Sequence, residues 1–311
     1  MDSPLLLIAP LYPPTQQALE TRYACHRLWE AADPQQLLAR IGDECRVAVT
    51  HGGRGVDAAT LEQLPALRLV ACFGVGVDAV DVDWCRVNGV AVTNTPDVLT
   101  DDVADLALGL LLAAVRRIAA GDRFVREGRW LSGPMMPTGS LQGRRVGIVG
   151  LGRIGRAIAR RCLAFNTEIG YHGPRPKPDV DWHYADSVVS LAEWADVLIA
   201  ACPGGPQTHH LVSRAALQAL GADGVFVNIA RGSVVDQAAL VELLASGALG
   251  SAGLDVFDDE PNVPSGLRSL DNVVLQPHQG SATFRTRGAM GQLVLDNVAA
   301  WFEGRPLLTP V

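Results

Sequence analysis

The chain has 311 residues, which is long enough for two domains of roughly 150 residues each. Hydrophobic residues make up 48% of it, charged residues make up 19%, and there are 32 glycines. This composition is typical of a folded α/β protein with many tight turns, and it excludes a disordered chain. The formal net charge of −7 argues against nucleic acid as a partner, because phosphate backbones select for clusters of Lys and Arg.

The six cysteines are widely spaced and form no C-x-x-C pair or Cys/His cluster with the spacing of zinc ligands. We therefore expect reduced thiols in a cytoplasmic protein, and no metal site. Residues 1–14 include an acid and no basic stretch, so they predict a first strand and turn rather than a signal peptide. The longest apolar run, Leu106–Val115, is too short to span a bilayer, and no membrane segment is expected.

The first third of the chain alternates short apolar runs with helical patterns. A helix is expected near Thr15 to Glu30 and a short one around Asp57. The alternation predicts a small parallel sheet. Its strands are expected at residues 4–10, 45–50, 67–74 and 90–96.

One long helix is expected at residues 100–128, with Thr100 as its N-cap, joining two domains. Six strands with intervening helical patterns follow, which predicts a doubly wound sheet. A last helix at residues 283–304 is expected to pack back on the first third. The expected domains are therefore 1–97 plus 284–311, which is discontinuous, and 98–283. The six strands are expected at residues 144–150, 167–173, 196–202, 224–230, 251–257 and 272–278.

The stretch "VGLGRIG" follows a predicted strand and opens a predicted helix, the context in which G-x-G-x-x-G binds a dinucleotide. Gly150 permits the tight turn, Gly152 lets the backbone approach the pyrophosphate, and Gly155 lets helix and strand pack closely. Arg153 and Ile154 lie in the same turn. The pyrophosphate is expected at the helix N-terminus, where unpaired N–H groups and the helix dipole favour an anion.

The stretch "GYHGPRPKPDV" lies where an NAD-binding domain usually places an acid for the adenosine ribose. No acid occurs there before Asp179. Gly173 and Pro174 leave a turned backbone without a carboxylate, and Arg175 offers a planar fork suited to a 2′-phosphate. The stretch therefore predicts NADP(H) as the cofactor, and the alternative is a solvated basic turn.

Three reactive side chains follow predicted strands, at the edge where ligands of such sheets bind. They are Arg231, Glu260 and His278. Each has an ordinary alternative: a solvated arginine, a member of the acidic turn at residues 258–260, and a packed core histidine. Their joint placement at one sheet edge favours a site.

Four ordered stretches, "VGIVGLGRIG", "NIARGSVVD", "GLDVFDDEP" and "PHQGSAT", resemble the motifs of the D-isomer-specific 2-hydroxyacid dehydrogenases. The stretch "TNTPDVLTDDVADLALGLLLA" and the ending "PLLTPV" are most similar to the NADPH-dependent hydroxypyruvate/glyoxylate reductase branch, which includes hydroxyphenylpyruvate reductases. The resemblance runs nearly end to end. It implies an α/β fold of two Rossmann-like or flavodoxin-like domains with doubly wound parallel sheets and the active-site cleft between them.

The resemblance also implies catalytic roles. Arg231 would bind the substrate carboxylate and stabilise the charge that develops on the keto oxygen. His278 would give that oxygen a proton as hydride arrives, and would contact the substrate as well. Glu260 would hydrogen-bond the imidazole and favour its protonated form.

Further contacts follow from the same resemblance. Val75 and Gly76 would clamp the substrate carboxylate through backbone N–H groups, whereas no role is carried over to His51. Asp255 would contact the nicotinamide end, with a buried structural acid as the alternative. The cofactor contacts implied are Cys202, Pro203, Thr208, Ile229, Ala230, Asp255 and Gly280.

The function implied is the reduction of small 2-oxo acids, hydroxypyruvate and glyoxylate first, to D-2-hydroxy acids. One alternative is a reductase of larger acids such as hydroxyphenylpyruvate or 2-ketogluconate. An alternative of another class is a dinucleotide-sensing, corepressor-like protein. The resemblance further implies a homodimer, with Gly128–Gly139 as the candidate contact because Trp130, Met135 and Met136 are expected to be exposed apolar residues. These side chains could instead pack within their own subunit.

Overall fold

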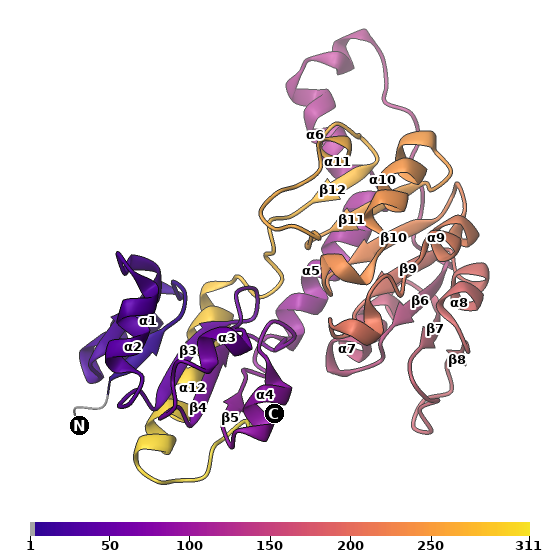
Figure 1. The fold of residues 1–311 in the computed structure, drawn as a ribbon. Coiled ribbons are helices and arrows are strands. Elements are labelled where there is room, and N and C mark those ends of the chain that lie inside the picture. The colour runs from indigo at the N-terminus through magenta and orange to yellow at the C-terminus, as the bar shows by residue number, and fades with distance from the viewer. Residues whose placement is uncertain (1–3) are drawn as a thin grey trace. The chain divides into compact units, whose positions relative to one another are not determined.

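The computed structural model describes residues 4–311, so the first three residues of the predicted amino-terminal strand and turn lie outside it. The chain divides into two compact units. Unit 1 comprises the residues up to Leu99 together with Ala282–Val311, and unit 2 comprises Thr100–Ser281. Each unit is built on its own parallel sheet (Figure 1).

Unit 1 holds a five-stranded sheet in the order β2-β1-β3-β4-β5, with every pair of strands parallel. This is the flavodoxin-like strand order. Successive side chains of the strands point to opposite faces, and one face packs on α2, α3 and α4 through a core that includes Leu6, Ala48 and Val70. The elements are β1 (Leu5–Leu7), α1 (Pro13–Arg22), β2 (Cys25–Arg27), the 3-10 helix η1 (Leu28–Glu30), α2 (Pro34–Ile41), β3 (Val47–His51), α3 (Ala58–Leu61), β4 (Leu69–Phe73), α4 (Val82–Val87), β5 (Ala91–Thr93) and α12 (Phe284–Phe302).

The carboxyl-terminal segment completes unit 1. Thr283 caps α12 by accepting a hydrogen bond from the N–H of Thr286, and the helix packs against α1 and β4. Beyond the helix, the Thr309 hydroxyl donates to the carbonyl of Asn94, and the N–H of Val311 donates to the carbonyl of Val92. Residues from both ends of the chain therefore form one unit.

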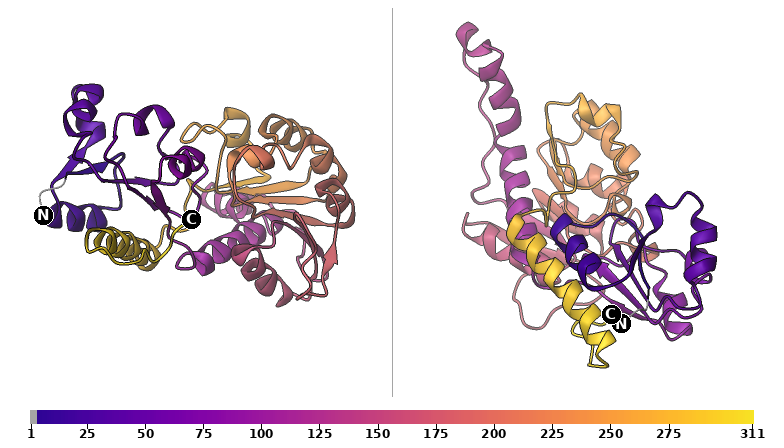
Figure 2. Two further views of the ribbon diagram at one scale, coloured as in Figure 1. Left: turned by 60° about the horizontal axis from the view of Figure 1, so that its bottom comes forward. Right: turned by 90° about the vertical axis from the view of Figure 1, so that its left-hand side faces the viewer.

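Unit 2 holds a seven-stranded parallel sheet in the order β12-β11-β10-β9-β6-β7-β8. Counted from β6, this is the Rossmann order 3-2-1-4-5-6 with one further strand, β12, at the edge. Helices α5 and α7 pack together on one face, and α8, α9 and α10 cover the other (Figure 2). The elements are α5 (Thr100–Val115), α6 (Ile118–Arg126), η2 (Arg129–Ser132), β6 (Arg145–Val149), α7 (Arg153–Leu163), β7 (Glu168–His172), β8 (His183–Tyr184), α8 (Val188–Trp194), β9 (Val197–Ala200), η3 (Pro206–Thr208), α9 (Arg214–Leu220), β10 (Val225–Asn228), η4 (Gly232–Val234), α10 (Gln237–Ser246), β11 (Ser251–Leu254), α11 (Ser265–Arg268) and β12 (Val273–Leu275).

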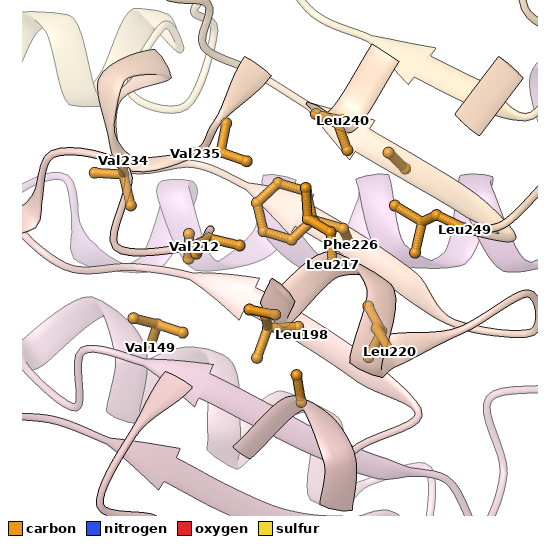
Figure 3. Close-up of a cluster of buried hydrophobic side chains, with 14 of the residues drawn as sticks. Val149, Leu198, Val212, Leu217, Leu220, Phe226, Val234, Val235, Leu240 and Leu249 are labelled. Atoms are coloured by element: carbon orange, nitrogen blue, oxygen red, sulfur yellow. The ribbon is translucent and has the colours of Figure 1, made fainter. Parts of the chain in front are cut away.

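The core of unit 2 is made by apolar side chains of alternate strand positions and of the covering helices. Phe226 of β10 and Leu198 of β9 pack with Leu217 of α9 and Leu240 of α10 (Figure 3). These side chains are almost completely buried, so the sheet and the helices on this face form a rigid platform for the loops at the strand ends.

Two short strands were not predicted, and one predicted helix is too long. Helix α1 ends at Arg22, and the residues assigned to its second half form β2 and η1. In unit 2, β8 of two residues is added beyond β7. Such short edge strands depend on pairing with a neighbour, β1 or β7, and carry no periodicity of their own.

The long helix predicted at residues 100–128 is two helices. Thr100 is the first residue of α5 rather than its N-cap. Arg117 adopts a left-handed conformation with φ of 49°, which ends α5 and redirects the chain into α6. The apolar periodicity of the sequence continues through this break, so the periodicity did not predict the break.

No helix within residues 4–311 has both the length and the apolar character needed to cross a membrane. All six cysteines are free thiols. In the same part of the chain, no three His, Cys, Asp or Glu side chains gather closely enough to hold a metal ion.

Candidate active site

The carboxyl edge of the seven-stranded sheet collects the reactive side chains of unit 2. Because all seven strands run parallel, the segments that follow them emerge at the same edge. The glycine turn follows β6, Arg175 follows β7 and Cys202 follows β9. Arg231, Glu260 and His278 follow β10, β11 and β12 in turn.

Each of the three glycines in the turn after β6 has a different structural role. Gly150 has a φ of +97°, and a Cβ there would lie 2.7 Å from the backbone of Cys202. A Cβ at Gly155 would lie 2.2 Å from the carbonyl oxygen of Gly150, so this glycine lets α7 pack against the turn. A Cβ at Gly152 would meet nothing within 4 Å, so open space lies in front of the residue that caps α7.

This geometry fits the diphosphate of a dinucleotide. Helix α7 begins at Arg153, and its N-cap, Gly152, has no side chain to occupy the first N–H groups of the helix. These N–H groups and the positive end of the helix dipole favour an anion. Arg153 and Ile154 form the first turn of α7, beside that space.

The segment after β7 carries the basic side chains. Gly173 has open space around its Cα, and Pro174 and Arg175 are exposed. Within residues 4–311, Arg175 makes neither an ion pair nor a side-chain hydrogen bond. Its guanidinium is therefore available to a ligand.

The loop after β9 is held by its own residues. The Thr208 hydroxyl donates to the carbonyl of Pro203 at 2.8 Å and approaches that of Gly205 at 3.2 Å. Burial raises the pKa of Cys202 to about 11, so its thiol stays protonated at neutral pH and is not a nucleophile. Thr208 therefore braces the loop, and Cys202 packs beneath the glycine turn.

His278 and Glu260 form a hydrogen-bonded pair. His278 Nδ1 lies 2.7 Å from Glu260 Oε2, and Glu260 Oε1 accepts from the N–H of Phe257 at 3.1 Å. Burial raises the pKa of Glu260, but the hydrogen bond to His278, the charge of His278 and the Phe257 N–H outweigh it, so the pKa is lowered overall. The carboxylate is ionised at neutral pH and orients the imidazole, which leaves Nε2 for a reacting group.

Asp255 shapes the turn that presents His278. Its backbone carbonyl accepts from the N–H of His278 at 2.8 Å, and its carboxylate accepts from the N–H groups of Gln279 at 2.6 Å and Gly280 at 2.8 Å. The turn holds His278 at a φ of +54°, a conformation that few side chains adopt without such support. Burial raises the pKa of Asp255 despite these hydrogen bonds. Asp255 is 2% exposed, and these contacts are all with the turn of His278. In this structure it is therefore a buried acid that supports the turn.

Gly280 completes this turn. A Cβ at this position would lie 3.0 Å from the Asp255 carboxylate and 3.4 Å from Val103 on α5. The glycine is buried, and its N–H is directed into the protein. In this structure Gly280 makes room for Asp255.

Asn228, which the sequence reasoning did not single out, holds the turn of Arg231. This residue ends β10 and is fully buried. Its Nδ2 donates to the carbonyl of Arg231 at 2.9 Å, and its Oδ1 accepts from the N–H of Ala230 at 3.0 Å. Ile229 and Ala230 are buried within the turn. A polar side chain at the last position of an otherwise apolar strand was the available signal.

The loops of Arg231 and Glu260 lie against each other. A Cβ at Gly232 would lie 2.0 Å from the carbonyl carbon of Phe257 and 2.2 Å from the nitrogen of Asp258, so the two backbones are in direct contact. The positive charge of Arg231 contributes to the lowered pKa of Glu260. The structure thus brings Arg231, Glu260 and His278 into one neighbourhood.

In unit 1, Val75 and Gly76 follow β4. The carbonyl of Val75 accepts from Asn94 Nδ2 at 2.9 Å, and that of Gly76 lies 3.7 Å from the Cys72 thiol. Within residues 4–311, neither of their N–H groups donates a hydrogen bond. Two adjacent backbone donors are therefore available to an anion. His51 ends β3, and its Nδ1 accepts from the N–H of Gly53 at 3.2 Å.

The arm of unit 2, defined here as residues 118–140, carries exposed apolar side chains. It contains α6, η2 and an extended return, and α6 and η2 extend beyond the sheet layers of their own unit (Figures 1 and 2). Trp130, Leu131 and Met136 are 66%, 95% and 79% exposed. Met135, which was expected to be exposed as well, is only half-exposed, because its sulfur lies beside Gly121 of α6.

The chain is similar to known proteins over its full length. The family model described as the NAD-binding domain of D-isomer-specific 2-hydroxyacid dehydrogenases matches residues 108–280. Hydroxyphenylpyruvate reductase of Plectranthus scutellarioides and glyoxylate/hydroxypyruvate reductase A of Arabidopsis thaliana are each 47% identical to the chain over 307 residues. Each alignment covers 99% of this chain and 98% of the relative.

A solved structure is similar to the chain over its full length as well. The crystal structure of an NADPH-dependent glyoxylate/hydroxypyruvate reductase from Sinorhizobium meliloti, in complex with NADP and malonate, is 42% identical in sequence. It superimposes with a TM-score of 0.94, covering 100% of this chain and 97% of that chain.

Proposed function

The chain belongs to the D-isomer-specific 2-hydroxyacid dehydrogenase family, and we propose that it reduces small 2-oxo acids to D-2-hydroxy acids with NADPH. Hydroxypyruvate and glyoxylate are the proposed substrates. The observation that carries this proposal is the His278–Glu260 pair, which lies with Arg231 at the same sheet edge as the glycine turn. An acid–base group, a cation and a dinucleotide site are the three elements that the reduction requires.

Residues 98–283 are the proposed cofactor-binding domain, and 1–97 with 284–311 the proposed substrate domain. The bound cofactor supplies the hydride. The diphosphate is assigned to the space in front of Gly152, where α7 begins. The remaining contacts are proposed at Gly150, Arg153, Ile154, Gly155, Cys202, Pro203, Thr208, Ile229, Ala230, Asp255 and Gly280.

The side chains have separate roles in the reduction. As the carbonyl carbon accepts hydride, charge develops on the keto oxygen, and His278 gives this oxygen the proton of Nε2. Glu260 holds the imidazole through Nδ1 and orients Nε2 toward the substrate oxygen. Arg231 binds the substrate carboxylate and stabilises the developing charge. In the oxidative direction, His278 accepts the hydroxyl proton.

Backbone donors complete the proposed recognition of the substrate carboxylate. The N–H groups of Val75 and Gly76 are adjacent and donate to no other group within residues 4–311. Charge-assisted hydrogen bonds from such donors select for a 2-oxo acid over an uncharged ketone or aldehyde.

NADPH is the proposed cofactor rather than NADH. Gly173 and Pro174 bring no carboxylate to the end of β7, and Arg175 has no partner among residues 4–311. A guanidinium in this place suits bidentate contact with a 2′-phosphate.

A homodimer is also proposed. The exposed side chains of Trp130, Leu131 and Met136 lie on one arm, and apolar surface of this kind is usually covered by a partner. In a two-fold symmetric dimer the same surface of both subunits forms the interface, so the arm of a second copy would cover this apolar surface.

The test is the loss of NADPH absorbance when the purified protein is mixed with a panel of 2-oxo acids. Fast turnover of hydroxypyruvate and glyoxylate is expected. Higher kcat/KM for hydroxyphenylpyruvate or 2-ketogluconate would support the alternative of a reductase of larger acids. A protein that binds NADPH but turns over no member of the panel would favour a corepressor-like sensor instead.

A further inference from the structure

The loop between β7 and β8 is held at three points. The N–H of Lys177 donates to the Tyr171 hydroxyl oxygen at 2.7 Å, and the Tyr184 hydroxyl donates to the carbonyl of Gly173 at 3.2 Å. At its far end, Asp179 forms a two-pronged ion pair with Arg156 on α7. Arg156 NH1 lies 2.8 Å from Oδ2, and NH2 lies 3.0 Å from Oδ1.

The loop alternates prolines with charged residues. Pro174, Pro176 and Pro178 restrict the backbone, and Arg175, Lys177 and Asp179 stand between and after them. Proline at three of six positions reduces the conformations open to the loop, so an anchor at its far end restricts the residues before it as well. The pair with Arg156 is that anchor.

The same pair removes a negative charge from the loop. Arg156 lies in the first turns of α7, the helix that the glycine turn opens, and its guanidinium faces both carboxylate oxygens of Asp179. Arg156 holds the pKa of Asp179 below its ordinary value, and the charge of Lys177 adds to this effect. Without Arg156, a bare carboxylate would stand four residues from Arg175.

We infer that the Arg156–Asp179 pair is a specificity-determining brace for NADPH. It holds the loop of Arg175 against α7, and it screens the Asp179 carboxylate from the 2′-phosphate. Arg156 is a positioning residue, and it acts on the cofactor through Asp179. This inference rests on the proposed function, because it assigns the 2′-phosphate to Arg175.

An effect on cofactor choice is expected rather than one on stability. Asp179 is 63% exposed, and exposed ion pairs contribute little to the free energy of unfolding. A 2′-phosphate, in contrast, carries a formal charge close to the loop and responds to each nearby carboxylate.

The test is a double-mutant cycle of Arg156→Gln, Asp179→Asn and the double variant. Calorimetry on the purified full chain would measure the binding of adenosine 2′,5′-bisphosphate and of 5′-AMP, which differ only in the 2′-phosphate. Kd values for NADPH and NADH would be measured alongside. Arg160→Gln and Asp181→Asn are matched controls, because both side chains are exposed on the same helix and loop and make no ion pair within residues 4–311.

Arg156→Gln is expected to weaken adenosine 2′,5′-bisphosphate and NADPH by roughly tenfold, the size expected of one uncompensated charge near a phosphate at the surface. Binding of 5′-AMP and NADH should change by less than about twofold. The double variant should recover the part of the loss that comes from the bare carboxylate, because that carboxylate is then gone as well. The two controls should bind all four ligands as the parent does.

Equal weakening of all four ligands, an effect no larger than in the controls, or no recovery in the double variant would overturn the inference. Arg175→Ala distinguishes this failure from failure of the proposed function. If Arg175→Ala selectively loses the 2′-phosphate and Arg156→Gln does not, only the brace is wrong. If Arg175→Ala has no selective effect, the assigned phosphate site is wrong, and the inference about the Arg156–Asp179 pair is wrong as well.

Discussion

His278 Nδ1 lies 2.7 Å from Glu260 Oε2, and the second oxygen of Glu260 is occupied by the N–H of Phe257. The carboxylate is therefore held at both oxygens, and it fixes the direction in which the imidazole presents Nε2. The lowered pKa of Glu260 means that the ion pair favours the charged carboxylate.

Glu260→Gln should therefore change the pH profile of reduction as well as its rate. The variant lacks the negative charge beside the imidazole that gives up the proton, so kcat/KM should fall and should depend differently on pH. The measurement is kcat/KM for hydroxypyruvate across pH. Asp258→Asn, which removes a charge from the same acidic turn, should leave the profile in place. An unchanged profile in Glu260→Gln would make Glu260 structural.

The same pair contributes to stability with a defined sign. Since the pKa of Glu260 is lowered in the folded state, its contribution is present at neutral pH and is lost as the pH falls through that lowered value. The difference in unfolding free energy between the parent and Glu260→Gln should thus shrink on acidification, as followed by urea unfolding at several pH values.

His278→Ala and Arg231→Ala should each reduce turnover by orders of magnitude. General acid catalysis alone is commonly worth about 10²–10⁴-fold, and a charge that stabilises the developing oxyanion is worth a similar factor. Steady-state kinetics would measure the loss, and NADPH binding should persist. His183→Ala, which removes an exposed imidazole from β8, is the matched control. Nearly full activity in either site variant would remove that residue from the mechanism.

Arg175→Ala should weaken NADPH by roughly 10- to 100-fold, since hydrogen bonds to charged groups contribute about 1.5–3 kcal/mol. NADH should be little affected, because it has no 2′-phosphate. Lys177→Ala should have a smaller effect in the same direction, since its N–H, not its ammonium, anchors the loop. The measurement is the Kd of NADPH and the Kd of NADH for the parent and each variant. Equal use of NADPH and NADH by the parent would count against the assignment.

Asp255→Ala should destabilise the protein and reduce kcat. It leaves the N–H groups of Gln279 and Gly280 without their acceptor, and an unsatisfied buried donor, here that of Gly280, costs about 1–3 kcal/mol. The turn should then no longer hold His278 at its left-handed φ. Urea unfolding and kcat test this together. A stable variant with full kcat would show that the turn forms without the carboxylate.

The arm predicts a dimer in solution. Sedimentation should give twice the mass of one chain, and Leu131→Asp should shift the equilibrium toward the monomer, because a charge on a covered apolar surface is not tolerated. Val87→Asp is the matched control, since Val87 is 85% exposed and lies in unit 1. A parent protein that sediments as a monomer would refute the proposal.

Much of unit 2 could be predicted because most of its strands have a clear apolar pattern in the sequence. Apart from β8, the strands from β6 to β12 are short, mostly apolar runs, and all of these except β9 end beside a Gly or a polar residue. In a parallel sheet, position along the strand alone decides which residues reach the carboxyl edge. Arg231, Glu260 and His278 could therefore be assigned to one edge without knowledge of the fold in space.

The weaker elements could not be predicted in this way. Strands β2 and β8 exist through pairing with β1 and β7, and three or two residues are too few for a periodic pattern. The break between α5 and α6 rests on one left-handed residue, Arg117, in an otherwise continuous apolar pattern. Local sequence has no strong signal for either event.

The sequence by itself determined the family, the doubly wound sheets and the order in which reactive residues arrive at a sheet edge, since these follow from local pattern and strand polarity. The resemblance implied that Glu260 contacts His278, and the tertiary structure decided which atoms meet, Nδ1 and Oε2. The tertiary structure alone showed Asp255 holding the turn of His278, and Arg156 holding Asp179. These contacts join residues 18 to 25 positions apart, and their partners are chosen by how loops pack at the sheet edge, to which sequence spacing gives no guide.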